Sequence, residues 1–118
     1  MEYALLLLES DEDFAIRRDP EKAGPYFAAW SAYVDALNAS GIVKAGAGLQ
    51  DPATATTVRV RGGSTDVQDG PFADVKEQLG GLFVIDVPDL DTALEWATRC
   101  PAAATGSVEV RPVLPPIN

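Results

Sequence analysis

Asp69 is the residue of this sequence whose type and position best suit proton-transfer chemistry. Gly62-Gly63 separates two segments of strand character, residues 56–61 and 64–69, and predicts a two-residue hairpin turn. Counting outward from that turn pairs Thr56 with Asp69 and Val58 with Val67, so Asp69 shares a face with valines. A carboxylate on an apolar face is a candidate general acid or base, although Asp before Gly-Pro also suits an ordinary turn.

The residues around Asp69 complete a candidate site. Lys76 is one of three lysines in an acidic chain and is a candidate partner for a substrate carboxylate, although a solvated surface role also fits it. Phe72 either walls a pocket or anchors its loop, and Arg59 stands opposite Asp66 in the predicted hairpin. The candidate catalytic residues are Asp69, Lys76 and Glu77, and the candidate substrate-binding residues are Phe72, Gln78 and Arg59.

The composition narrows the chemistry. The chain has no histidine and one cysteine, Cys100, which excludes Ser-His-Asp and Cys-His catalysis and the usual zinc sites, so we expect neither a metal nor a cofactor. A net charge of −9 argues against nucleic acid or an anionic membrane as partner. The single cysteine indicates a reducing compartment. The apolar run at residues 5–8 is too short for a signal peptide or a membrane span, so we expect a cytoplasmic protein.

The hydrophobic pattern predicts the elements that position these residues. At 118 residues and 47% hydrophobic content, we expect one domain over residues 1–118. The expected elements before the hairpin are a central strand at 3–8, an acidic loop at 10–19, a helix from about Pro25 to Gly41 and a strand at 42–49. After the hairpin we expect a central strand at 82–87, a helix that begins at Asp89, and an edge strand at 107–113. Asp89 is the N-cap of that second helix, and its buried face carries Leu90, Ala93, Leu94 and Ala97.

The first helix carries a broad apolar stripe at helical spacing. Its members are Tyr26, Phe27, Trp30, Tyr33, Val34 and Leu37. The regularity of the spacing favours core packing over the lining of a ligand pocket, which is the alternative.

This element order is that of an α+β, ferredoxin-like split βαβ fold with an inserted β-hairpin. Two helices cover only one face of such a sheet, and both central strands are apolar on both faces. We therefore expect a homodimer in which the open sheet faces stack, as in a dimeric α/β barrel.

Several motifs together resemble the DGPF-domain group of the YCII-related family. They include Asp69-Gly70-Pro71-Phe72, the opening Tyr3-Ala4-Leu5-Leu6-Leu7, and Lys76-Glu77-Gln78-Leu79-Gly80-Gly81. The resemblance covers essentially the whole chain and implies a dimeric α/β-barrel fold. YCII-like relatives are thought to use a histidine and an aspartate in a cleft, and only the acidic half has a candidate here.

The resemblance leaves two functions open. One is a cofactor-independent isomerase, lyase or dehalogenase acting on a small carboxylic acid, with Asp69 moving the proton and Lys76 holding the anion. The other is a non-catalytic dimer that binds a small ligand or a regulatory protein, since DGPF proteins tend to be encoded near alternative sigma factors. A cofactor-independent monooxygenase, supported only by the aromatic stripe, ranks last.

Overall fold

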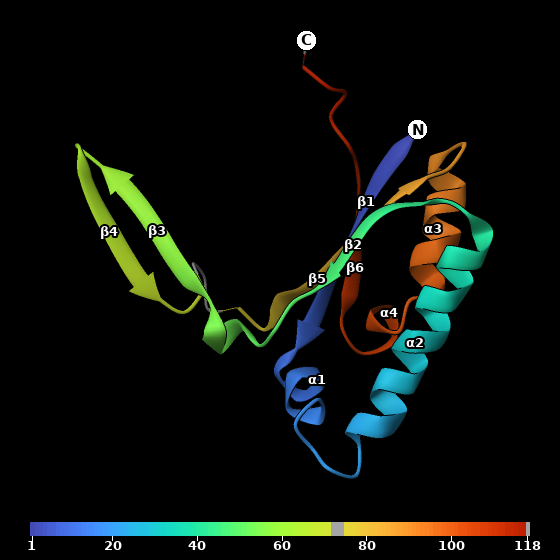
Figure 1. Cartoon of the computed structure of the whole chain (residues 1–118), viewed down its shortest axis with the longest axis horizontal. Helices are drawn as coiled ribbons and strands as arrows, with labels where there is room; N and C mark the ends of the chain where they lie inside the picture. The colour runs from blue at the N-terminus through green and yellow to red at the C-terminus, as the bar shows by residue number, and fades with distance from the viewer. Residues whose placement is uncertain (72–74, 118) are drawn as a thin grey trace.

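A computed structural model gives the structure of the chain and describes residues 1–71 and 75–117. The strands are β1 (Glu2–Ser10), β2 (Val43–Gly48), β3 (Thr56–Arg61), β4 (Ser64–Asp69), β5 (Glu77–Asp86) and β6 (Ser107–Pro112). The helices are α1 (Asp11–Ile16), α2 (Ala23–Ser40), α3 (Leu90–Arg99) and α4 (Ala102–Thr105), with a 3-10 turn η1 (Pro52–Thr54). The order β2-β5-β1-β6 in an antiparallel sheet, with β3-β4 apart, confirms the predicted α+β ferredoxin-like fold with an inserted hairpin (Figure 1).

The two long helices lie on one face of the four-stranded sheet (Figure 1). Side chains alternate along β1, so Tyr3, Leu5 and Leu7 are buried while Ala4, Leu6 and Leu8 are half-buried on the opposite side. The register sets Val84 opposite Ala4 and Leu82 opposite Leu6, which extends that second face onto β5. The uncovered sheet face is therefore apolar, as predicted.

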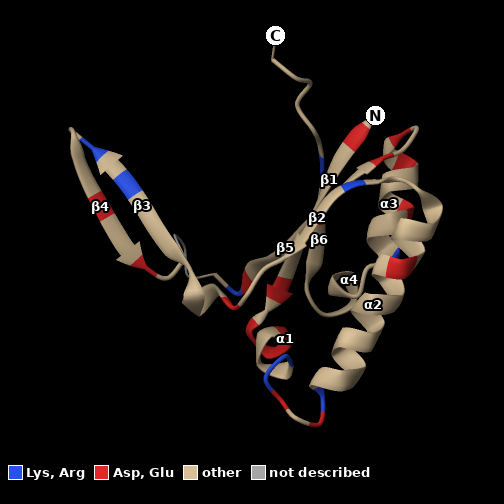
Figure 2. Cartoon of the chain, in the orientation of Figure 1, with Lys and Arg blue, Asp and Glu red and all other residues tan. Residues whose placement is uncertain are grey.

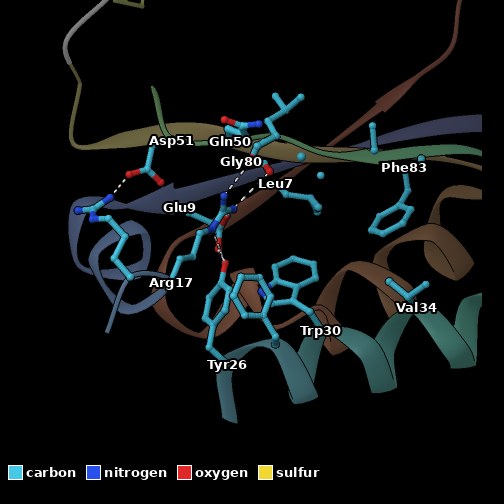
Figure 3. A pocket seen from close by; sticks show the side chains of 17 residues that line it. Leu7, Glu9, Arg17, Tyr26, Trp30, Val34, Gln50, Asp51, Gly80 and Phe83 are labelled. Atoms are coloured by element: carbon cyan, nitrogen blue, oxygen red, sulfur yellow. Dashed lines mark hydrogen bonds and ion pairs between the residues drawn. The ribbon is translucent and has the colours of Figure 1, made fainter. Parts of the chain in front are cut away.

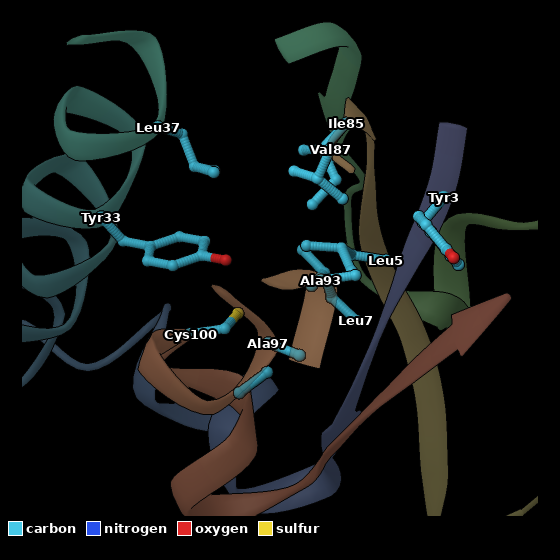
Figure 4. Packing of buried hydrophobic residues seen from close by; sticks show 11 residues of the cluster. Tyr3, Leu5, Leu7, Tyr33, Leu37, Ile85, Val87, Ala93, Ala97 and Cys100 are labelled. Carbon is cyan, nitrogen blue, oxygen red and sulfur yellow. The ribbon is translucent and has the colours of Figure 1, made fainter. Parts of the chain in front are cut away.

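The core fills the space between this sheet and the C-terminal half of α2 (Figure 4). Leu5 and Ile85 from the sheet and Leu37 from α2 are fully buried. The Tyr33 hydroxyl donates a 2.8 Å hydrogen bond to the Trp96 carbonyl and so ties α2 to α3. Cys100 is buried in the same cluster.

The acidic segment after β1 is a helix rather than the expected loop. Ser10 and Asp13 form a capping box at the start of α1, in which each side chain bonds the other residue's backbone amide. The acidic residues of its first turn also suit the positive end of the helix dipole. The Ser10–Asp13 pair is a helix-start signal in the sequence, but the many acidic residues of this segment led to the prediction of a loop.

The other corrections concern element ends and one helix face. Strand β5 begins at Glu77 rather than residue 82, because β1 continues to Ser10 and pairs with it past a bulge between Leu7 and Leu8. Asp89 caps α3 as predicted, but Leu90 and Leu94 are 47% and 44% exposed while Ala93 and Ala97 face the core.

The β3-β4 hairpin has the predicted register throughout, including Thr56 opposite Asp69 and Val58 opposite Val67. Gly62 and Gly63 both adopt positive φ, 57° and 78°, as a tight hairpin turn of the primed type requires. The hairpin extends away from the sheet and helices (Figure 1), and Val58, Val60 and Val67 on its apolar face are exposed rather than part of the core.

Among the residues that the structure describes, no helix is long and apolar enough to cross a membrane.

We predict that Leu37→Ala lowers the free energy of unfolding by about 2–5 kcal/mol, because it empties a fully buried site between α2 and the sheet. The matched control, Leu94→Ala on the exposed side of α3, should cost less than about 1 kcal/mol. Urea denaturation followed by circular dichroism measures both values. Equal losses in the two variants would contradict this description of the core.

Candidate functional site

A cavity of about 740 Å³ lies between the N-terminal half of α2 and the sheet, beside the core (Figure 3). Its walls are mostly apolar and aromatic, and its polar groups gather at one end. The lining residues used below are Glu9, Arg17 and Tyr26 at the polar end, Phe27, Trp30 and Phe83 along the walls, and Arg18 and Asp51 beside Arg17.

Glu9 is a buried carboxylate at the polar end of this cavity. It follows Leu7 at the strand period of two, so it points to the helix-covered side of the sheet and is only 2% exposed. The Tyr26 hydroxyl donates to one carboxylate oxygen, and Arg17 forms an ion pair with the other. Such partners are what permit an ionised carboxylate to stay inside a protein.

Arg17 joins this carboxylate to three further parts of the chain. Its Nε donates to the Tyr26 hydroxyl at 3.1 Å, its Nη1 to the Leu49 carbonyl at 2.6 Å, and its Nη2 also reaches the Gly80 carbonyl at 3.4 Å. Burial lowers the pKa of Arg17, but the Tyr26 hydrogen bond and the charge of Glu9 outweigh it and raise that pKa above its usual value. The guanidinium is therefore a permanent cation.

Tyr26 is the polar group best placed to act on a bound molecule. Burial, and next the hydrogen bond to Glu9, raise its pKa to about 12. The hydroxyl thus remains protonated at neutral pH, between the carboxylate that accepts its proton and the guanidinium that donates to its oxygen. The set Glu9, Arg17 and Tyr26 is called the buried triad below.

Gly80 makes room for the triad. It is the additional residue of β5 at the bulge opposite Leu7 and Leu8. A Cβ atom placed on Gly80 would overlap the Glu9 carboxylate and touch Arg17. A glycine at this position therefore lets the carboxylate lie against the strand.

The aromatic walls come from the stripe of α2 that the spacing assigned to the core. Tyr33 and Leu37 do lie in the core, whereas Tyr26, Phe27 and Trp30 line the cavity. Tyr26 packs edge-to-face on Phe27 at 5.0 Å between ring centroids. The core prediction was therefore right for Tyr33 and Leu37, whereas the pocket alternative fits the other four members of the stripe, Val34 included.

The charges around the cavity are paired. Glu9 balances Arg17, and at the rim Arg18 forms an ion pair with Asp51 (Figure 3). The cavity thus offers a net neutral, aromatic space in which the Tyr26 hydroxyl donates its proton to Glu9 and can accept from a bound molecule, a setting suited to a small ring compound with hydroxyl substituents.

The structure places the residues predicted from sequence away from this cavity. Asp69 and Lys76 are exposed, and Arg59 lies opposite Asp66 in the hairpin. Glu77 accepts a hydrogen bond from Ser107, and Gln78 donates one to the Val75 carbonyl. Phe72 lies outside the described residues. Among the described candidates, none lines the cavity. Their chemical role stays a prediction.

The sequence reasoning missed the buried triad. The available signal was the alternation of β1, because Tyr3, Leu5 and Leu7 on the buried face predict that Glu9 also points inward. Tyr26 belonged to the stripe for which a ligand pocket was the alternative, but nothing local pointed to Arg17. The contacts of both residues with Glu9 arise only where α1 and α2 meet the end of β1.

Comparison with known proteins gives a family and a fold. The YCII-related domain model matches residues 1–117. An uncharacterised protein of Rhizobium meliloti (strain 1021) is 51% identical over 61 residues, and the alignment covers 50% of this chain and 49% of the relative. The chain therefore spans about half the length of the curated relative that it matches.

A solved structure has the same fold. It is the 5-chloro-2-hydroxyhydroquinone dehydrochlorinase of Burkholderia phenoliruptrix AC1100 in complex with 2,5-dihydroxybenzoquinone. The TM-score is 0.55 at 15% sequence identity, and the match covers 97% of this chain and 94% of the enzyme. At that identity the likeness concerns the fold alone.

We predict that Gly80→Ala lowers the free energy of unfolding by about 1–3 kcal/mol, because the added methyl group forces the buried carboxylate away from its partners. Gly48→Ala is the matched control: it also lies in a strand at the cavity wall, but its Cβ meets open space, so its stability should stay within about 1 kcal/mol. Chemical denaturation of both variants decides this. A Gly80→Ala protein as stable as its control would contradict the description of the triad.

We also predict that Tyr26 stays largely protonated at pH 11, because its pKa is about 12. This raised value contributes stability that is present below pH 10, the ordinary pKa of tyrosine, and is lost as pH rises to about 12. Glu9→Gln leaves Arg17 as the only charge beside the hydroxyl and should increase the ionised fraction at pH 11. Tyrosinate absorbance, with Tyr26→Phe subtracted, measures this. Full ionisation of wild-type Tyr26 at pH 11 would refute it.

Proposed function

Because the chain belongs to the YCII-related family, we propose that it is an enzyme of isomerase, lyase or dehalogenase type that moves a proton on a small ring compound bound in the cavity beside α2. The observation that carries the proposal is the buried carboxylate of Glu9, which is joined to the Tyr26 hydroxyl at the wall of an aromatic cavity. An ionisable pair held out of water in a cleft is typical of acid–base sites.

The proposed step is a proton relay through the triad. A hydroxyl of the bound ring gives its proton to the Tyr26 oxygen while Tyr26 passes its own proton to Glu9, so that tyrosinate never accumulates. The electron pair left on the ring oxygen then expels a substituent as an anion, or shifts a double bond, in which case Glu9 returns the proton through Tyr26 to a ring carbon. Arg17 forms an ion pair with the Glu9 carboxylate and remains charged throughout.

The size and charge of the cavity support a neutral or weakly acidic ring rather than a strongly anionic acid. Each nitrogen of the Arg17 guanidinium already donates to a protein acceptor, and Arg18 is paired with Asp51. A carboxylic acid substrate, as predicted from the sequence, would compete with Asp51 for Arg18. The fold neighbour was solved with a dihydroxybenzoquinone, which supports testing that class of compound first.

The same contacts favour a second candidate, a non-catalytic module that binds such a compound without converting it. A triad whose members satisfy one another also stabilises the end of β1 without any chemistry. This candidate retains the cavity and the ring-shaped ligand, and it differs from the enzyme only in lacking turnover.

We predict that the chain binds 2,5-dihydroxybenzoquinone in calorimetry and releases chloride from 5-chloro-2-hydroxyhydroquinone. Tyr26→Phe keeps the ring and loses the hydroxyl, so it should lower kcat by about 10²–10⁴ while changing the Kd of the quinone by less than about threefold. Asp69→Asn, on the exposed hairpin, is the control and should behave as wild type.

The outcomes separate the alternatives. Loss of turnover in Asp69→Asn but not in Tyr26→Phe would support the sequence prediction and refute the cavity proposal. Binding without turnover in the wild type would favour the non-catalytic module. Absence of binding to either ring compound would refute both.

A further inference from the structure

The cavity beside α2 is larger than a single bound ring requires. Its volume is about 740 Å³, whereas a space of about 150 Å³ already holds a benzene ring. A one-ring compound whose hydroxyl reaches Tyr26 therefore leaves most of the cavity unfilled. Ligand sites in proteins usually enclose most of the surface of their ligand. The size of the cavity thus favours a longer ligand.

The helix wall gives the length of the cavity. Tyr26, Trp30 and Val34 follow one another at intervals of four residues, so they lie on one side of α2, and all three line the cavity. At a rise of about 1.5 Å per residue, Val34 lies roughly 12 Å further along the helix axis than Tyr26. Figure 3 shows Val34 and Phe83 at the end of the cavity away from the buried triad.

The sheet side of the cavity carries few side chains. Gly48 lies opposite Gly81, which lies opposite Leu7, so both glycines are on the helix-covered face of the sheet. A Cβ atom on Gly48 would meet no other atom within 4 Å. Gly46 lies opposite Phe83, and a Cβ atom on Gly46 would come within 2.7 Å of that ring. The glycines therefore expose strand backbone, and Gly46 lets the Phe83 ring lie against β2. Gly46, Gly48 and Gly81 are called the glycine floor below.

The end of the cavity away from the triad is apolar. Residues 23–34 of α2 include no charged residue, so most of this helix is tan in Figure 2. The charged lining residues Glu9, Arg17 and Asp51 lie at the triad end (Figure 3). A charged substituent at the far end would lose its water without finding a counter-ion. A flat, apolar group is complementary to both the glycine floor and the aromatic side chains of α2.

We propose that the ligand of this cavity has a second, apolar ring fused to its hydroxylated ring, and that the second ring lies between Val34 and the glycine floor. The proposal rests on the proposed function, because the hydroxyl at Tyr26 decides which end of the ligand faces the triad. A fused ring suits the space better than a flexible chain, since it is flat and loses no internal rotations on binding. The substrate class is then a hydroxylated two-ring aromatic compound or quinone.

Calorimetry with three compounds that share one polar head tests the second ring. The compounds are catechol, 2,3-dihydroxynaphthalene, which adds a fused ring, and 4-butylcatechol, which adds the same number of carbon atoms as a chain. We expect the wild type to bind 2,3-dihydroxynaphthalene at least about tenfold tighter than catechol, because the added ring buries apolar surface. It should also bind 2,3-dihydroxynaphthalene tighter than 4-butylcatechol.

Val34→Trp should remove this preference, because the larger side chain fills the far end of the cavity. Catechol and 2,3-dihydroxynaphthalene should then bind within about threefold of each other, while the affinity for catechol itself changes by less than about threefold. The matched control is Ala32→Trp. Ala32 is exposed on the same helix and does not line the cavity, so this variant should keep the wild-type preference.

Nuclear Overhauser contacts in the wild-type complex test the same placement without a variant. Protons of the unsubstituted ring of 2,3-dihydroxynaphthalene should contact the Val34 methyl groups, and protons of the hydroxylated ring should contact Tyr26. The reverse orientation would overturn the inference. Equal affinity of the wild type for catechol and 2,3-dihydroxynaphthalene, tighter binding of 4-butylcatechol, or an unchanged preference in Val34→Trp would do so as well.

The same experiments separate this inference from the proposed reaction. Preference for two rings without turnover of any hydroxylated ring compound would refute the reaction and leave the second-ring site standing. Turnover of a one-ring compound with no gain in affinity from the second ring would overturn the second-ring site alone. Absence of binding to all three catechols would also overturn it.

Discussion

The structure depends on one constraint, the burial of the Glu9 carboxylate at the end of β1. An ionised group inside a protein costs several kcal/mol unless partners replace its water. Arg17 and Tyr26 are those partners, and they bring α1 and α2 to the same end of the strand. Arg17 also bonds the Leu49 and Gly80 carbonyls, so the segment after β2 and the bulge of β5 meet there as well.

This constraint divides α2 into two parts with different functions. Its C-terminal half presents Tyr33 and Leu37 to the sheet and completes the core. Its N-terminal half contributes Tyr26 to the triad and Trp30 to the adjacent cavity wall, where a cavity separates the helix from the sheet. The packed core thus fixes the position of the groups at the polar end of the cavity, as the proposed acid–base role requires.

Local chemistry predicted much of the fold but not the site. Gly62-Gly63 predicted the hairpin register and Asp89 predicted the start of α3, because turns and caps are decided by neighbouring residues. The register alone did not show that the hairpin stands apart from the core, so the apolar face that Asp69 shares with Val58 and Val67 was interpreted as the setting of a catalytic carboxylate. The triad joins residues 9, 17 and 26 through tertiary contacts, which local patterns do not encode.

The central claim is that the cavity beside the triad, and not another surface, receives the ligand. Two tryptophans make the most direct measurement possible, because Trp30 lines the cavity whereas Trp96 packs on the core under Arg99. In ¹H–¹⁵N spectra recorded during titration with 2,5-dihydroxybenzoquinone, we expect the Trp30 indole signal to shift and the Trp96 signal to stay in place. A stationary Trp30 signal at saturating ligand would contradict the claim.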